Sequence, residues 1–369
     1  MSSAMRRPAL HFAPSGAFAR DLRRSLRQLA TKGAPRHGDP AQWLRGGVCT
    51  RAGLAAYGLL LSGRLTPGAA VLAIVAAAFC AFLLIVQLGH DAAHGALSSR
   101  GWINRAIVLG VFAILGVDGV LWRDRHIRLH HQVVNLPGTG IDADSVTLLR
   151  LAPDKPWHWW YRLQPLYAPL VYALGHASVM WVEDFIGFRA ARAERRPEFA
   201  GVAPLARFLA GKALHLLVFV LLPLLVLRPG PATALLGYAL ASAVIAHCFV
   251  LLVVGTHVSD LAAFPLPDAE GRLAQDWATH QLATAVDWAP TSRLAAWLSG
   301  GANAHAAHHL FPRYSHCHLA TLSALVAEQA AMHGLQHRVT SFRGMVLGHC
   351  RHVIALSRKP ARQNLPSGK

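Results

Sequence analysis

Histidine is the residue type whose number and spacing in this chain could support catalysis. The 369 residues include 22 histidines, more than the 18 aspartates and glutamates together. Three short motifs contain most of the clustered ones, namely His90 and His94; His126, His130 and His131; and His305, His308 and His309. Residues three or four positions apart share one face of a helix. Each motif, including the pair His126 and His130, is therefore expected to direct its imidazoles one way.

A metal centre is the chemistry that clustered imidazoles favour, since imidazole binds Zn, Cu, Fe and Ni. His257 lies just past the end of an apolar segment and adds a ninth histidine to the set. A structural zinc takes four ligands and usually includes cysteine, whereas the five cysteines here form no CxxC motif. Nine histidines exceed the needs of one metal, so the count predicts two metals with four or five nitrogens each.

Other polar residues are expected to support the motifs. Four aspartates could hold histidine N–H groups, namely Asp91, Asp124, Asp142 and Asp144. Three arginines could bind an anionic head group or an acidic protein, or could simply be solvated, namely Arg123, Arg125 and Arg128. The isolated histidines are expected to be structural or exposed, namely His11, His37, His158, His333, His337, His349 and His352.

The composition indicates a membrane protein. Hydrophobic residues make up 53% of the chain and charged residues 15%, whereas a soluble domain carries about 25% charged residues. The formal net charge is +18, and the basic residues flank apolar segments rather than forming a basic soluble domain. Such charges suit anionic lipid better than nucleic acid.

Four apolar segments are predicted to span the bilayer as two helical hairpins. Their expected bounds are 46–64, 68–88, 208–228 and 232–255. The turns of the two hairpins hold just Arg64 and Arg228 as charged residues. Because positive residues favour the cytosolic side, both termini and all the histidine motifs are expected in the cytosol. The stretches 103–122 and 163–182 are then expected to be interfacial or re-entrant.

The predicted fold is therefore an all-α integral membrane protein, in which two transmembrane hairpins carry a cytosolic helical cap with a histidine-rich dimetal site. Residues 1–42 are expected to form a basic, partly flexible cytosolic arm, residues 43–325 the membrane domain, and residues 326–369 a basic cytosolic tail. Arginine supplies most of the 36 basic residues, which favours a bacterial source and an inner membrane. An interfacial aromatic belt is expected from Trp122, Trp157, Trp159, Trp160 and Tyr161.

The motifs resemble those of the membrane fatty acid desaturase family. Gly89–Gly95 (GHDAAHG) is similar to the family's first histidine box, and Trp122–Asn135 to its second, with an acidic patch following at Asp142–Asp144. Gln164–Leu170 (QPLYAPL) resembles a further family stretch. The most specific similarity is the run His280–Pro312, which ends in HAAHHLFP and resembles the linoleoyl-CoA or front-end branch.

This resemblance implies a di-iron site, O₂ as co-substrate and the introduction of a double bond into a fatty acyl chain. The acyl chain could be carried by CoA, by acyl carrier protein or in a lipid. The chain has no HPGG motif of a fused cytochrome b5 domain, so a separate electron donor of the ferredoxin, rubredoxin or cytochrome b5 type is expected. The implied iron ligands are His90, His94, His126, His130, His131, His257, His305, His308 and His309.

Two positions depart from the family pattern. His305 stands where the front-end branch usually has glutamine, and Val253 stands where the acyl-CoA branch has asparagine. A related di-iron hydroxylase is the alternative function, because similar boxes serve both outcomes, although the C-terminal run favours desaturation. A non-catalytic metal- or haem-binding membrane protein is disfavoured, because transporters keep their ligands within the spans.

Overall fold

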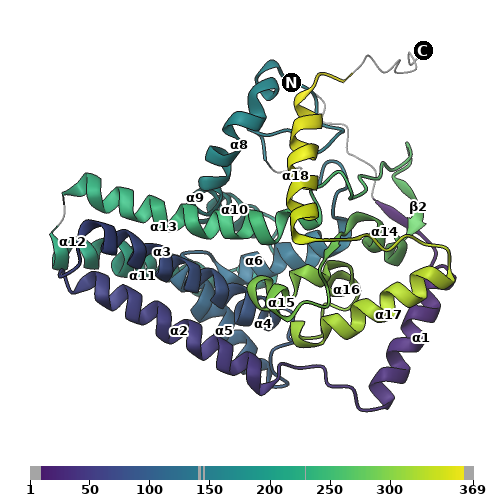
Figure 1. Ribbon diagram of the computed structural model, residues 1–369, viewed down its shortest axis with the longest axis horizontal. Coiled ribbons are helices and arrows are strands. Elements are labelled where there is room, and N and C mark those ends of the chain that lie inside the picture. Colours follow the sequence, from purple (N-terminus) through teal and green to yellow (C-terminus); the bar gives the residue numbers. More distant parts are fainter. Residues whose placement is uncertain (1–9, 140–142, 144–145, 229, 361–369) are drawn as a thin grey trace.

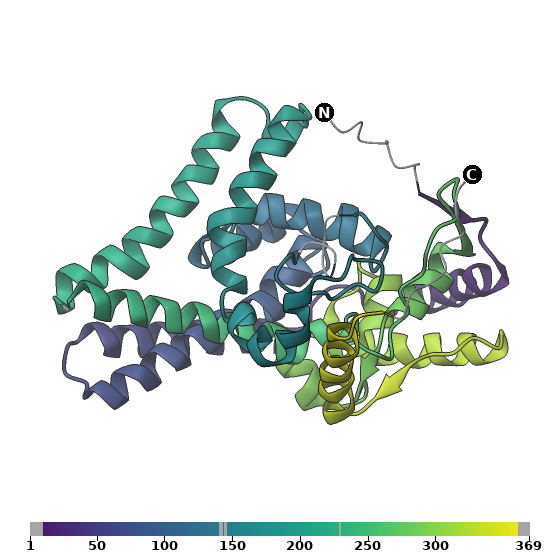
Figure 2. The same cartoon turned by 90° about the horizontal axis from the view of Figure 1, so that it is seen from above.

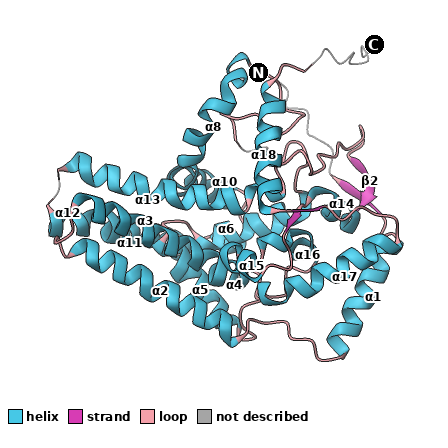
Figure 3. Cartoon of the chain, in the orientation of Figure 1, coloured by secondary structure: helices cyan, strands magenta, loops and turns pink. Residues whose placement is uncertain are grey.

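The computed structural model describes residues 10–139, 143, 146–228 and 230–360. Long apolar helices extend to one side of a cap of shorter helices, and strands are few (Figures 1 and 3). The described strands pair two by two, with His11–Ala13 (β1) beside Arg272–Asp276 (β2) and Asp287–Trp288 (β3) beside Val339–Thr340 (β4). The predicted helical membrane fold with a histidine-rich cap is confirmed.

The first hairpin consists of Pro40–Leu61 (α2) and Pro67–Leu84 (α3). Both helices begin with proline at a first-turn position, and the side chains of Asp39 and Thr66 accept from backbone N–H groups there, which is how helix N-termini are normally capped. A π-helical turn, Ile85–Gly89 (η1), joins α3 to His90–Ala93 (α4).

The span that α3, η1 and α4 form together is longer than the bilayer core. The continuous helix from Pro67 to Ala93 has 27 residues, or about 40 Å at 1.5 Å per residue, whereas the hydrocarbon core is about 30 Å thick. The end of the helix therefore lies beyond the hydrocarbon, which is where the first histidine motif is found.

The second hairpin consists of Val202–Leu216 (α11), Leu217–Leu221 (η7), Leu222–Leu227 (α12) and Pro231–Leu252 (α13). Among the described residues, three helices are long and apolar enough to span a membrane, and α2 is not one of them. Arg45 and Arg51 lie within α2 and lower its hydropathy. With 22 residues, α2 is still about 33 Å long, and it packs along α3.

A sharp bend precedes the second histidine motif. Gly101–Ile114 (α5) and Gly119–Val133 meet at 107°, and the second part comprises Gly119–Arg125 (α6), His126–His130 (η2) and His131–Val133 (α7). At the bend, Lys212 Nζ donates to Asp184 Oδ2 at 2.7 Å and to the carbonyl of Gly116 at 2.5 Å. Asp184 Oδ2 also accepts from the backbone N–H of Asp118 at 2.8 Å. This buried ion pair fixes the angle at which α6 leaves the bend.

The second stretch predicted to be interfacial or re-entrant, 163–182, begins with Gln164–Ala173 (α8). This helix runs across the direction of α13 (Figure 1). Leu166, Leu170 and Leu174 are exposed four residues apart and so form one apolar stripe. After α8 come Gly175–Ser178 (α9), Val179–Glu183 (η5) and Asp184–Ala193 (α10). A helix that crosses the spans with an exposed apolar stripe is typical of the membrane interface.

The cap is built mainly from the C-terminal part of the chain. Its helices are Trp277–Thr284 (α14), Arg293–Ser299 (α15), His305–Leu310 (α16), Leu319–Met332 (α17) and Phe342–Ser357 (α18). Short helical turns cover Trp159–Leu163 (η4), Pro197–Phe199 (η6), Val254–Thr256 (η8), Ala302–Ala304 (η9) and His316–His318 (η10). Figure 2 shows this cap, in green and yellow, at the opposite end from the hairpin turns.

The N-terminal arm is less free than the sequence suggested. Ala17–Thr31 (α1) packs on α17 and α14, and Phe18 and Leu22 are buried in the same core cluster as Val326. Gly16 N donates to Asp276 Oδ2 at 2.6 Å, which helps to fix the entry to α1. The charges of α1 hide an amphipathic pattern whose apolar face is buried in the cap, so a loosely attached arm is not found over residues 11–31.

Candidate metal centre

All nine histidines of the predicted set lie together where the long helices meet the cap. They come from the two ends of α4, from η2, α7 and α16, and from the residue that follows η8. Eight of them form two groups of four, and within each group one nitrogen per histidine lies within 4.8 Å of the others. The first group is His90, His94, His126 and His308, and the second is His130, His257, His305 and His309.

His131 lies between the two groups. Its Nε2 is 3.2 Å from His126 Nε2 in the first group, and its ring stacks on that of His309 in the second, with centroids 4.3 Å apart. The side chain is buried. The ninth histidine is therefore placed to join either group or to bridge them.

The second and third motifs divide their histidines between the groups, which differs from the prediction for the pair His126 and His130 but agrees with it for His305 and His309. His126 belongs to the first group and His130 to the second, because the backbone over these residues is π-helical rather than α-helical. A π turn takes one more residue than an α turn, and such turns often mark functional sites. In α16, His305 and His309 are four residues apart and share a group, whereas His308 joins the other. The prediction is correct for His90 and His94, which share one group.

The hydrogen bonds of the second group suit a cation between the rings. His257 Nδ1 lies 2.8 Å from the carbonyl oxygen of Thr284, which can only accept, so this nitrogen carries the proton. His309 Nδ1 likewise lies 2.8 Å from Gln281 Oε1. The two Nε2 atoms, which face each other at 2.9 Å, then both present lone pairs. Two lone pairs at that distance repel unless a cation lies between them, and ligands of one metal are about 3 Å apart when each bond is about 2 Å.

The third motif is held in the protonation state that binds metal. Burial is the main reason that the pKa values of His305, His308 and His309 lie well below 6.5, and neighbouring histidines lower them further. Metal ligands must be neutral imidazoles. Several buried ring nitrogens also have no hydrogen-bond partner in the described part of the chain, including His94 Nε2 and His308 Nε2 of the first group. Buried polar atoms are rarely left unpaired, so these nitrogens fit the role of metal ligands.

Helix α14 supports the second group, a role that was not predicted from the sequence. Gln281 is fully buried and accepts from His309, and the carbonyl of Thr284 accepts from His257. The side chain of Asp287, also fully buried, accepts from Ala306 N at 2.8 Å, from Ser323 Oγ at 2.9 Å and from His337 Nε2 at 2.9 Å. These contacts fix where α16 begins and how its rings turn. The sequence signal that could have indicated this supporting role is the presence of polar residues outside the histidine motifs, such as Gln281.

We expect Gln281→Leu to weaken metal binding about 10- to 100-fold, which is the usual effect of removing a partner that orients a ligand. The leucine fills the same space but leaves His309 Nδ1 without an acceptor, whereas Gln281→Glu keeps one. Metal content of the purified variants after graded chelation measures the difference. The control is Gln275→Leu, the same change at an exposed position of β2. Equal metal retention by Gln281→Leu and Gln275→Leu would contradict this role.

The aspartates near the motifs do not hold the clustered histidines as expected. Asp124 pairs with Arg196 and lies 3.4 Å from Arg128 Nε, because arginine charges surround it. Asp91 Oδ1 is 3.8 Å from His90 Nδ1, too far for a hydrogen bond. The other oxygen, Oδ2, accepts from Gln42, Ser315 and His316, which lie outside the three motifs. Asp142 and Asp144 lie outside the described residues.

The second motif also has aromatic and cationic neighbours with specific contacts. Trp122 stacks on His126 with centroids 4.5 Å apart, so it supports the site rather than an interfacial belt. Arg123 Nε donates to the carbonyl of Ala93 at 2.7 Å and so ties α6 to α4. Arg125 pairs with Glu183 at 3.0 Å. These arginines serve the structure through described partners.

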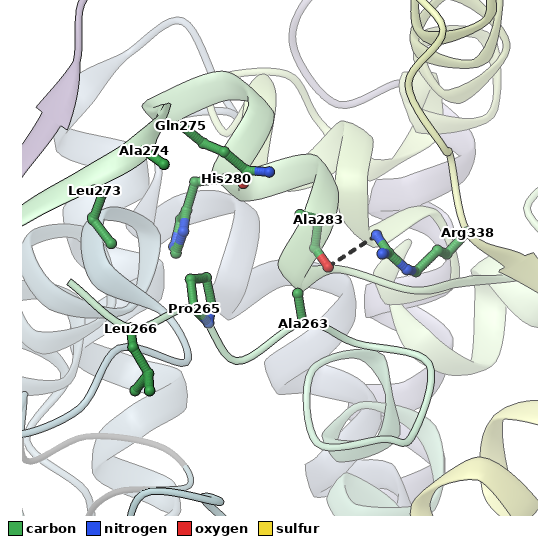
Figure 4. A pocket seen from close by; sticks show the side chains of 9 residues that line it. All are labelled: Ala263, Pro265, Leu266, Leu273, Ala274, Gln275, His280, Ala283 and Arg338. Carbon is green, nitrogen blue, oxygen red and sulfur yellow. Dashed lines mark hydrogen bonds between the residues drawn. The ribbon is translucent and has the colours of Figure 1, made fainter. Parts of the chain in front are cut away.

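An apolar pocket beside α14 is lined by none of the nine site histidines. Figure 4 shows His280 facing it between Leu273 and Pro265, with Arg338 nearby donating to the carbonyl of Ala283 at 3.1 Å. The cavity has a volume of about 280 Å³. Burial lowers the pKa of His280 to about 4, and its Nε2 lies 3.1 Å from the carbonyl of Val134. This neutral histidine therefore links α14 to the segment after the second motif.

Comparisons with known proteins agree with this centre. The fatty acid desaturase family model matches residues 65–341. An sn-1 linoleoyl-lipid 6-desaturase of Arthrospira platensis is 31% identical over 257 residues, which cover 69% of this chain and 68% of the relative. A desaturase of the same description from Synechocystis is 29% identical, covering 79% and 80%. An acyl-lipid (8-3)-desaturase of Mortierella alpina is 25% identical, covering 79% and 66%.

The matched region contains all three histidine motifs and His257, and it extends over most of the chain. The relatives' activities are those of the front-end type that the C-terminal run resembles. The predicted oxidoreductase activity is thereby confirmed at the level of the family, and this chain belongs to the fatty acid desaturases of membranes.

Proposed function

We propose that the chain is a di-iron desaturase that uses O₂ to introduce a double bond into an acyl chain of a membrane lipid. The observation that carries the proposal is the pair of four-histidine groups, side by side and mostly buried, in a chain of the desaturase family. The proposed ligands are the eight grouped histidines together with His131, which lies between the groups.

Iron is the metal that the reaction favours. The donor set consists of imidazoles, which suit Fe, Zn, Cu and Ni alike, so the residues alone leave the choice open. Two bound irons would supply the oxidising chemistry that removes two hydrogens from an unactivated acyl chain, and zinc has no redox chemistry. The choice of iron therefore rests on the family's activity.

The chain's own residues position the ligands and keep water out. The carbonyl of Thr284 and the side chain of Gln281 hold the protons of His257 and His309 on Nδ1, so that both Nε2 atoms face the centre. Asp287 fixes the start of α16. His305, His308 and His309 are all at most 4% exposed, and a dry site limits side reactions of an oxidising centre.

Relatives and topology suggest the substrate and the orientation. The relatives are described as linoleoyl-lipid and acyl-lipid desaturases, which favours a lipid over CoA or acyl carrier protein as the acyl carrier for this chain. The hairpin turns carry few charges and the cap carries many, and the positive-inside rule then favours a cytosolic cap with both termini in the cytosol. The excess of arginine over lysine supports a bacterial inner membrane. Electrons would then come from a separate cytosolic protein of the ferredoxin, rubredoxin or cytochrome b5 type.

The test combines metal analysis with product analysis. We expect about two irons per purified chain and, in a host of defined fatty acid composition, a new double bond that mass spectrometry locates in membrane lipids. His257→Ala provides the matched control for the host's own desaturation. Stoichiometric zinc without iron, in protein from iron-replete cells, would contradict the proposal. A hydroxylated product would favour the hydroxylase alternative.

A further inference from the structure

A buried polar network on α4 adjoins the first histidine group. At its centre is Asp91, one residue after His90 and three before His94. Asp91 Oδ2 accepts from Gln42 Nε2 at 2.9 Å, from His316 N at 3.0 Å and from His316 Nδ1 at 3.0 Å. The hydroxyl of Ser315 lies 2.8 Å from the same oxygen and 2.7 Å from Gln42 Oε1.

This network joins three segments that are far apart in sequence. Gln42 is in the first turn of α2, Asp91 is in α4, and Ser315 and His316 lie just beyond α16. Gln42 Nε2 also donates to the carbonyl of Gln87 at 2.7 Å, within the π turn that precedes His90. The network therefore fixes α4 to the loop that follows the third motif.

The burial of the network makes it costly to disturb. Gln42 and Ser315 are 0% exposed, Asp91 is 3% exposed and His316 is 4% exposed. A buried carboxylate is tolerated when hydrogen bonds and an ion pair satisfy it, and removal of one partner leaves the other unsatisfied. The positions of α4 and of the loop are therefore coupled.

The coupling between α4 and the loop after α16 affects the first histidine group more than the second. α4 supplies His90 and His94 to the first group, and the loop continues directly from α16, which supplies His308. The second group takes no residue from α4, and α14 supports it through Gln281 and Thr284. A shift of α4 would therefore separate the ligands of the first group while the second stays assembled.

We propose that Asp91 and His316 form a positioning pair, which holds His90 and His94 in register with His308 for the first metal. The inference deepens the proposed function and rests on it. It assigns a role to His316, which lies outside the three histidine motifs and whose sequence context gives it no apparent function. Neither residue is proposed to touch the metal or the substrate.

The test uses two substitutions of His316 in the full-length protein. His316→Leu removes one of the donors to Asp91, the ring Nδ1, whereas His316→Asn keeps an N–H close to the place of Nδ1. We expect the Leu variant to bind the first metal about 10- to 100-fold more weakly, so that it retains about one iron per chain and shows the EPR signal of a mononuclear ferric ion. The Asn variant is expected to retain two irons.

A metal-independent measurement separates this pair from general destabilisation. Hydrogen exchange of the metal-free proteins is expected to rise at residues 87–95 in the Leu variant but not at α14. The control is His318→Ala. His318 lies in the same short turn as His316, and its Nε2 is 2.9 Å from the carbonyl oxygen of His37. If the Leu variant does not fold, His316→Gln is compared with His316→Asn. The amide of glutamine is displaced by one carbon from the place of Nδ1, so the Gln variant is expected to lose the first iron.

Two irons in the Leu variant, or equal losses in the Leu and Asn variants, would overturn the inference. Loss of both irons together, with raised exchange in α14, would also overturn it, because the network would then serve the whole cap. Failure of the proposed function is distinguishable, since it would show as absence of iron from the unsubstituted protein, whereas the exchange comparison needs no metal.

Discussion

His305→Ala is expected to abolish desaturation while the protein still inserts into the membrane. His305 is 4% exposed, and its Nε2 lies 2.8 Å from His257 Nε2 in the second group. Alanine removes a nitrogen from the proposed ligand set and leaves a cavity in a site that other rings already crowd. His305→Gln is expected to retain some activity, because the front-end branch has glutamine here and an amide oxygen can replace one neutral donor. Product yield per membrane-inserted enzyme measures both effects.

Iron content and a surface control complete this experiment. The Ala variant is expected to lose iron from the second group, in contrast to the first-group loss expected for His316→Leu. His158→Ala changes an exposed histidine that stacks on Trp160, so its yield should equal that of the unsubstituted enzyme. Full activity in His305→Ala would remove this residue from the proposed ligands and with it the nine-histidine set.

Truncation after Thr340 is expected to abolish both stable folding and iron binding, because it removes α18. Met345 and Val353 of this helix are 1% and 5% exposed, and burial of such side chains contributes about 1.5–3 kcal/mol each. Their sum is a large part of a typical net stability of about 5–15 kcal/mol. His349 Nδ1 also lies 2.7 Å from the carbonyl of Val258, the residue after His257.

The yield of detergent-solubilised protein, its thermal midpoint and its iron content measure the effect of this truncation. Truncation after Pro360 is the control, because all of α18 is retained. A stable, iron-loaded protein ending at Thr340 would show that the cap folds without α18. The region predicted as a cytosolic tail over residues 326–369 contains α18 and the second half of α17, so its described part is a packed portion of the cap.

The membrane segments were accessible from sequence because their signal is local. A run of 21 residues without charge, ending just before His90, needs no partner to be recognised as a bilayer span. The packing of α1 and α18 into the cap was not predicted, for the opposite reason. The sequence of α1 is rich in arginine. The burial of each helix depends on residues hundreds of positions away: Phe18 shares a core cluster with Val326, and His352 Nε2 lies 2.8 Å from the carbonyl of Leu151.

The histidines of the site were accessible as a set but not in their grouping. The spacing rule places His90 and His94 together, since their segment is α-helical. The same rule fails for His126 and His130, because a π turn depends on packing around the helix and has no simple sequence pattern. Supporting residues such as Gln281 and His316 meet the site through the tertiary fold, so a single sequence does not reveal them.

The π turn at His126–His130 makes the length of this segment matter more than its intervening side chains. Deletion of one residue there would restore an α turn and rotate every following histidine by about 100°, the angle between successive residues of an α-helix. His130 and His131 would then leave their places in the centre together. Exchange of Ile127 or Leu129 for another apolar residue keeps the register. Over evolutionary time, insertions and deletions should therefore be purged from this segment more strictly than substitutions at those two positions.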